Sequence, residues 1–396
     1  MKQQTLYQID SKGNTRQWSI HVRTAQHGAD IVVEAGIMGG KLVETVTPID
    51  SGKNAGRANA TDPYQQACAE AQSEVDKKLK KGYVSDLAQA KSSATLGSGV
   101  PAPMLAQKYD PAMKQGGSKD LAKLKLGGKT VYASDKLDGN RCLAHVTTQG
   151  AKLFTRKGIP FPNIQHIQDQ LTECFKRVYG YVNSKYGVTE YWIDGELFTQ
   201  KYSFNKVNGL LKKGSLTPDD MRVVADIGFH IYDVILPVGY ETRYKIIQYF
   251  KAANLFVVEA KEIVATEQTL TAMLEDALKR KQEGLIVRQL GVPYEHKRTW
   301  QLLKYKVFED AEFSIVGFKK SITGDTLGSI EFDQGNGNTF HATFNGTDDE
   351  QQHIWDNRDQ FLGQRMTVEY FGFSPVEEGG RPRFPKAKAL RGVNDN

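Results

Sequence analysis

The segment from Lys136 to Arg141 places an amine nucleophile, a carboxylate, a turn residue and a second cation in the pattern Lys-x-Asp-Gly-x-Arg. The Lys136 amine can attack an activated phosphate only while it is deprotonated, which requires partial desolvation or nearby cations. Gly139 would let the backbone approach a ligand, and the planar Arg141 guanidinium could bind phosphate or ribose oxygens. Because such a turn is more often a solvated hairpin, this segment alone does not establish catalysis.

Further segments with chemically useful side chains follow along the chain. Asp194–Leu197 and Glu283–Arg288 each place a glutamate beside a glycine, and Tyr232 lies in an apolar segment. Lys304 and Lys306 alternate, so on a strand they would point the same way. Taken singly, these are more often solvated turns, core and an exposed strand face. Their order along the chain favours one common site.

In this order the segments resemble the motifs of the covalent nucleotidyltransferase superfamily, and within it an ATP-dependent DNA ligase of the compact viral or bacterial type. The similarity extends from about Pro103 to the C-terminus. The resemblance implies that Lys136 takes AMP from ATP as a phosphoramidate and passes it to the 5′-phosphate of nicked duplex DNA. It also implies Mg²⁺ as the metal, with Mn²⁺ as the alternative.

The resemblance further assigns roles to single residues. Glu196 binds the ribose and, with Glu283, the metal, since Mg²⁺ accepts one or two carboxylates and fills its octahedron with water and phosphate oxygens. Tyr232 stacks on adenine, where the family more often has phenylalanine. The other nucleotide contacts are Arg141, Arg156, Lys304, Lys306 and Arg391, and the DNA contacts are Arg156, Arg298, Arg381, Arg383, Lys386 and Lys388. Arg243 also fits a family arginine, and Arg391 with Asp395 would orient the pyrophosphate, although the lysine that commonly ends that motif is absent.

Composition bounds the setting of these motifs. The 396 residues are enough for two or three domains with separate cores, and the net charge is +6. Residues 96–307 carry 31 Lys and Arg against 21 Asp and Glu, whereas residues 308–396 carry 9 against 15. A basic middle suits a polyanionic substrate, and an acidic C-terminal part can offer only one face to DNA. The three isolated cysteines and the absence of a long apolar run predict a reducing, cytoplasmic setting without membrane contact, including the host cytoplasm for a viral protein.

The pattern of strands and helices predicts an α+β, multidomain chain. We expect a small N-terminal α+β DNA-binding domain (1–83), a flexible Ala/Ser/Gly/Pro-rich linker (84–101), a nucleotidyltransferase core of ATP-grasp-like type with antiparallel sheets (102–307) and a C-terminal OB-fold barrel (308–396). The first domain faintly resembles WGR-type nucleic-acid-binding modules, although the Trp-Gly-Arg tripeptide is absent. The barrel strands are expected near 313–318, 329–332, 339–344, 365–371 and 386–391. A monomer is expected.

Other functions share part of this pattern. An RNA ligase or an mRNA-capping guanylyltransferase would use the same lysines and glutamates, but the ligase-like start at Pro103–Ala106 and the ending Arg381–Pro385 favour a DNA ligase. An NAD-dependent ligase is disfavoured because no zinc-finger cysteine set is present. A non-enzymatic nucleic-acid-binding protein would leave the central motifs unexplained. Formation of a covalent AMP adduct separates the last class from the others.

Overall fold

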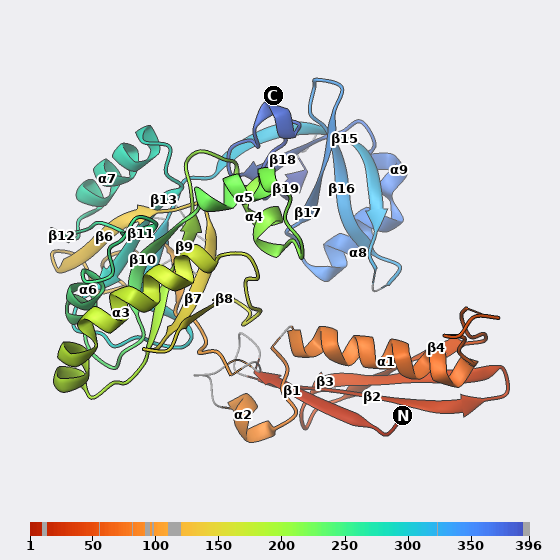
Figure 1. Cartoon of the computed structure of the whole chain (residues 1–396). Helices are drawn as coiled ribbons and strands as arrows, with labels where there is room; N and C mark the ends of the chain where they lie inside the picture. Colours follow the sequence, from red (N-terminus) through yellow and green to blue (C-terminus); the bar gives the residue numbers. More distant parts are fainter. Residues whose placement is uncertain are drawn as a thin grey trace. The chain divides into compact units, whose positions relative to one another are not determined.

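The computed structural model describes residues 1–9, 14–54, 56–80, 82–91, 96, 99–109, 120–322 and 324–390. The chain divides into two compact units, Met1–Tyr305 and Lys306–Asn396 (Figure 1). The first unit contains three sheets and most of the helices, and the second contains a closed barrel. The α+β class predicted from the sequence is confirmed.

The N-terminal part is an antiparallel four-stranded sheet with one helix packed on it. Helix α1 (Pro63–Lys80) presents Ala67, Ala71 and Val75 to the sheet at a spacing of four residues, which places them on one helix face. They pack with Leu6, Trp18, Ile20 and Val22 in a core of their own. The strands are β1 (Gln4–Ile9), β2 (Thr15–Ala25), β3 (Gly28–Ile37) and β4 (Leu42–Ile49).

Two segments of this part were not foreseen. Strand β4 has no buried side chain along its length, so it lacks the alternation of apolar and polar residues that identifies a half-buried strand. Val84 pairs with Tyr7, and Leu87–Lys91 form helix α2, both inside the segment predicted as a linker.

The middle of the chain forms two five-stranded sheets, in the orders β11-β10-β9-β7-β8 and β12-β6-β13-β14-β5. Most neighbours are antiparallel, as expected; β10 with β11 and β14 with β5 are parallel. The strands are β5 (Leu105–Tyr109), β6 (Thr130–Lys136), β7 (Asn140–Val146), β8 (Ala151–Thr155), β9 (Tyr191–Phe198), β10 (Gly228–Val234), β11 (Leu255–Val257), β12 (Ala260–Val264), β13 (Gly284–Gln289) and β14 (Arg298–Tyr305). The helices are α3 (Gln165–Tyr186), α4 (Phe204–Lys212), α5 (Pro218–Ala225), α6 (Tyr240–Ile247) and α7 (Glu267–Lys279).

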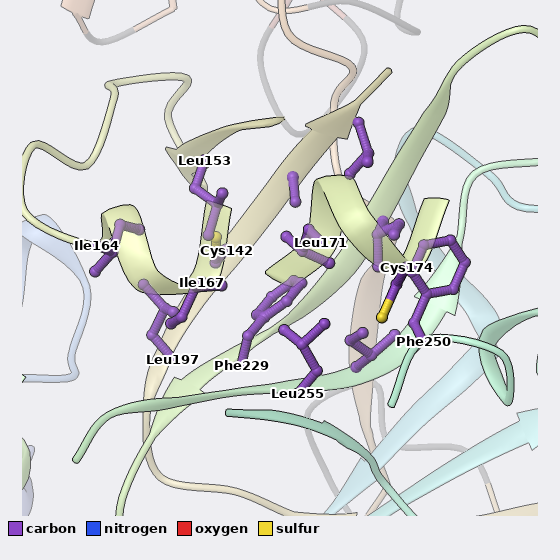
Figure 2. Packing of buried hydrophobic residues seen from close by; sticks show 14 of the residues in the cluster. Cys142, Leu153, Ile164, Ile167, Leu171, Cys174, Leu197, Phe229, Phe250 and Leu255 are labelled. Carbon is purple, nitrogen blue, oxygen red and sulfur yellow. The ribbon is translucent and has the colours of Figure 1, made fainter. Parts of the chain in front are cut away.

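One face of the first of these sheets carries the largest core. Helix α3 contributes Ile167, Leu171, Cys174 and Phe175, which meet Phe229 and other side chains of the strands (Figure 2). Since side chains alternate across a strand, the neighbouring residues Arg141, Glu196 and Tyr232 are left on the opposite face. The buried face therefore fixes the sheet that carries these polar side chains.

The second unit is a five-stranded barrel of OB type, in the order β15-β16-β17-β19-β18. Strand β15 pairs with both β16 and β18 and has register shifts along its pairing with β16, which lets one long strand close the barrel. The strands are β15 (Glu309–Lys320), β16 (Leu327–Asp333), β17 (Thr339–Phe344), β18 (Arg365–Tyr370) and β19 (Lys386–Leu390), with α8 (Asp348–Asp356), α9 (Arg358–Phe361) and the 3₁₀ turn η1 (Val376–Glu378) between them.

Within the described ranges, none of the helices has both the length and the apolar character needed to cross a membrane.

Candidate active site

Two motifs that are 147 residues apart in the sequence meet at Lys136 and Glu283. Strands β6 and β13 are antiparallel neighbours, with Lys136 opposite Gly284, and the Glu283 backbone N–H donates to the Lys136 carbonyl at 3.1 Å. The Lys136 ammonium forms an ion pair with the Glu283 carboxylate. The side chain of Lys136 is 24% exposed and that of Glu283 only 7%, so the amine can be reached from solvent while its partner is buried.

Gly139 is required by a neighbouring strand. A Cβ atom at this position would lie 2.6 Å from the Leu197 carbonyl oxygen and 2.7 Å from Cγ of Glu196. The sequence predicted that this glycine lets the backbone approach a ligand. In the structure the group that approaches it is β9, which the glycine allows to lie against the turn after Lys136.

Glu196 stands on β9 opposite Arg141 of β7 and His230 of β10. Burial raises the pKa of its carboxyl to about 8, while the charges of Lys136 and Arg141 act in the opposite direction. The Tyr232 hydroxyl lies 3.4 Å from its Oε2. A half-buried carboxyl of this kind is poised to take up a cation or to accept hydroxyl hydrogen bonds.

Arg141 makes its strongest contacts with Asp194. Its Nε and Nη2 donate to the two Asp194 oxygens at 3.0 and 2.5 Å, and Asp194 is 1% exposed. The Tyr294 hydroxyl donates to the same carboxylate at 2.6 Å. Such a two-pronged ion pair fixes the plane of the guanidinium.

The Tyr232 ring, expected to stack on adenine, lies among cations. The guanidinium carbons of Arg141 and Arg288 are 5.9 and 5.2 Å from its centroid. Its backbone carbonyl accepts a hydrogen bond from the Tyr240 hydroxyl at 3.2 Å. These contacts hold the ring in place on β10 and place it beside Glu196.

Arg156 and Arg298 add positive charge near Arg141. The pKa of Arg156 is lowered by burial and then by the charges of Arg141 and Arg298, so both of these arginines act on Arg156. Arg298 begins β14 and donates to the Ala106 carbonyl at 2.5 Å. Like charges at this density favour an anion between them.

Lys304 and Lys306 do not share a strand, contrary to the expectation that both lie on one. Lys304 lies on β14 opposite Ile286 of β13, but β14 ends at Tyr305. Lys306 belongs to the second unit, where its Nζ lies 4.7, 4.4 and 5.7 Å from the ring centroids of Phe308, Phe371 and Phe384. Attraction of an ammonium to aromatic faces accounts for this position.

The basic residues predicted to form one DNA-binding cluster on the barrel differ in their contacts. Lys388 is paired with Glu369 at 2.7 Å and with Asp310 at 3.3 Å, whereas Lys386 donates to the Thr343 hydroxyl. Arg381 is exposed, and the Arg383 guanidinium lies over the rings of Phe371 and Phe384. Arg391 and Asp395 lie outside the described residues.

Comparison with known proteins identifies the family of this site. The family model of the ATP-dependent DNA ligase domain matches residues 103–306, which include Lys136, Glu196, Glu283, Lys304 and Lys306. The chain belongs to the ATP-dependent DNA ligase family. Two DNA ligases of African swine fever virus isolates are 23% and 22% identical to it over 303 residues. The alignment covers 73% of this chain, which spans 64% of the length of these relatives.

Solved structures share the fold of this ligase chain. A chain named Pmar-Lig_PreS3 is 21% identical with a TM-score of 0.58, covering 74% of this chain and 69% of its own length. A structure from a study of Lig E DNA ligases is also 21% identical with a TM-score of 0.56, covering 74% of this chain and 100% of its own.

Several side chains of the ligase site were missed in the sequence. Asp194 and Arg288 lie inside motifs named in the sequence analysis but were given no role there, and Tyr294 lies in no motif.

Arg243, suggested as a family arginine, is 1% exposed and donates to Asp233 at 2.7 Å and to the Val238 and Val292 carbonyls. Its contacts are those of a buried structural residue that ties the end of β10 to α6.

The donor set for a metal is sparse. Among the residues that the structure describes, no group of three or more His, Cys, Asp or Glu side chains could hold an ion. Glu196 and Glu283, two carboxylates close to Lys136, are donors of the type that Mg²⁺ accepts, and Mg²⁺ in nucleotide sites takes most of its ligands from water and phosphates.

Proposed function

We propose that this chain seals nicks in duplex DNA at the expense of ATP. The observation that carries the proposal is the placement of Lys136 beside Glu283, on a strand next to the sheet that carries Glu196 and Tyr232. A partly exposed amine in contact with a buried carboxylate, with the charges of Lys136 and Arg141 both acting on the neighbouring Glu196, suits attack on a phosphate and stabilisation of the charge that develops there. The family match over residues 103–306 supports ATP as the donor.

With Lys136 as the nucleophile, the proposed reaction has three steps. The Lys136 amine attacks the α-phosphorus of ATP, so that a P–N bond forms and the bond to pyrophosphate breaks. The DNA 5′-phosphate then attacks the same phosphorus, which forms DNA-adenylate and releases the amine. Finally the 3′-hydroxyl attacks the DNA phosphorus, a phosphodiester forms and AMP leaves.

We assign the remaining residues by their positions. Glu196 and Arg141 bind the ribose, Tyr232 holds the adenine, and Lys304 and Lys306 contact the phosphates. Mg²⁺, held by Glu196 and Glu283, would neutralise phosphate charge.

The DNA contacts are proposed for two regions. Arg156 and Arg298 take the 5′-phosphate, since the charges of Arg141 and Arg298 both act on Arg156 and favour an anion there. On the barrel, Arg381, Arg383 and Lys386 are the better candidates, because Lys388 is already paired with two carboxylates. Residues 1–83 are proposed to grip the duplex, with 84–101 as linker and boundaries at 102–307 and 308–396 for the other domains. The chain is proposed to act as a monomer in the cytoplasm.

The test is covalent labelling. The purified chain is incubated with labelled ATP, GTP or NAD and Mg²⁺, alongside Lys136→Ala and the surface control Lys176→Ala, and is then denatured and separated. We expect label from ATP in the wild type and the control, none in Lys136→Ala, and discharge by nicked DNA. Label from GTP alone would indicate a capping enzyme, discharge only by nicked RNA would indicate an RNA ligase, and no label would leave a binding protein.

A further inference from the structure

The Tyr294 hydroxyl contacts three polar groups near the proposed nucleotide site. It donates to Oδ2 of Asp194 at 2.6 Å, accepts from the Met104 backbone N–H at 2.9 Å, and lies 3.4 Å from Nη2 of Arg141. Tyr294, Asp194 and Met104 are 7%, 1% and 4% exposed. A buried hydroxyl with this set of neighbours has little freedom to turn elsewhere.

The direction of each hydrogen bond follows from the chemistry of the partners. An ionised carboxylate can only accept, so the single hydroxyl hydrogen goes to Asp194. The lone pairs of the oxygen are then left for the N–H groups of Met104 and Arg141. Burial raises the pKa of Tyr294, so the hydroxyl keeps the hydrogen that this arrangement requires.

The same loop fastens the start of the ligase domain. The Lys297 carbonyl accepts from the Leu105 N–H at 2.9 Å, a ring nitrogen of His296 lies 2.7 Å from the Ala102 carbonyl oxygen, and β5 pairs in parallel with β14. Tyr294 is the member of this loop that also reaches the Arg141 and Asp194 pair.

We propose that Tyr294 is a positioning residue of nucleotidyl transfer, which holds Asp194 in the rotamer that accepts both arms of Arg141 and so presets Arg141 for the nucleotide. The inference rests on the proposed function, since Arg141 must contact the nucleotide. Without the hydroxyl, Asp194 loses one donor and the Met104 N–H loses its acceptor, so the carboxylate that orients the Arg141 guanidinium is itself held less firmly.

The experiment compares Tyr294→Phe with Tyr191→Phe in single-turnover adenylylation of the full chain. Tyr191 is a matched control, because it is 1% exposed and its hydroxyl has no hydrogen-bond partner among the described residues. We expect the ATP concentration for half-maximal rate to rise about tenfold in Tyr294→Phe, the size of one hydrogen bond to a charged group, and to stay at the wild-type value in the control. Asp194→Asn, which keeps the side-chain shape, should raise it as well, and the double variant should be no worse than the poorer single variant.

The outcomes separate the two proposals. A wild-type chain that takes no label from ATP would refute the proposed function and this inference with it. A wild type that labels, with Tyr294→Phe lowered only in melting temperature and unchanged in its ATP dependence, would overturn the inference alone. If Tyr294→Phe does not fold, an unchanged ATP dependence in Asp194→Asn overturns it.

Discussion

Replacing Glu196 with glutamine should make the unliganded protein more stable at pH 8 while making it less active. Burial raises the pKa of this carboxyl from its ordinary value of 4.5 to about 8 in the folded state. Between these values the folded chain holds a proton that the unfolded chain has released. Stability therefore falls as the pH rises from about 4.5 to about 8, and then levels off. A neutral glutamine avoids this loss and keeps the shape of the side chain.

The size of the effect follows from the shift. One pKa unit corresponds to about 1.4 kcal/mol, so the full shift sets an upper limit of about 5 kcal/mol. Glu196 is only half-buried, and relaxation of water and of the nearby Lys136 and Arg141 charges reduces the expected gain to about 1 to 2 kcal/mol at pH 8. For a domain of this size that is a rise in melting temperature of about 2 to 8 °C.

The assay is thermal unfolding of wild type, Glu196→Gln and Glu173→Gln at pH 5, 6.5 and 8, without nucleotide or metal. Glu173 is an exposed carboxylate on α3 and serves as the control for removing one charge. The advantage of Glu196→Gln over the control should grow from pH 5 to pH 8. If it is the same at both pH values, Glu196 does not have a raised pKa and the reasoning fails. Covalent labelling of the same sample should show reduced adenylylation, because a glutamine no longer supplies a charged oxygen.

Three further perturbations test other contacts. Gly139→Ala should cost about 1 to 3 kcal/mol in denaturant unfolding, because the added methyl overlaps β9. Arg243→Met should cost about 3 to 5 kcal/mol in the same measurement, because it removes the nearer ion-pair partner of the buried Asp233 and leaves only Arg288 at 3.8 Å; a loss below 1 kcal/mol would contradict this. In titrations of nicked duplex against salt, Arg381→Ala should weaken binding more than Lys388→Ala, and the reverse order would show that the acidic partners of Lys388 release it on DNA.

The elements that could be predicted are those with a strong local pattern. The barrel strands lie close to their predicted ranges, because each combines alternating apolar residues with turn residues at its ends. Strand β4 was missed because neither of its faces is buried. Lys304 and Lys306 alternate in sequence as a strand would, yet β14 ends between them, where three phenylalanine rings of the barrel unit attract the second lysine.

Individual contacts in the site were harder to foresee than its motifs. Lys136 and Glu283 could be paired by family order, and the register of β6 and β13 places them in contact. Asp194 and Tyr294 could not be paired in the same way, since they are 100 residues apart and an aspartate or a tyrosine alone carries no spacing signal. Only the packing of two sheets, set by apolar side chains throughout the chain, brings them together.

In the proposed reaction, the contact between Lys136 and Glu283 has to change before the amine can attack. In the ion pair the Lys136 nitrogen donates to the carboxylate, whereas attack on phosphorus requires its lone pair. Separating the two strands to free it would break the β6–β13 ladder, in which the Glu283 N–H donates to the Lys136 carbonyl. The change must therefore occur in the side chains, by loss of the lysine proton or by rotation of one group. Because Glu283 is buried, we expect the group that enters the site beside it to decide that change, which would tie activation of the amine to assembly of the substrate complex.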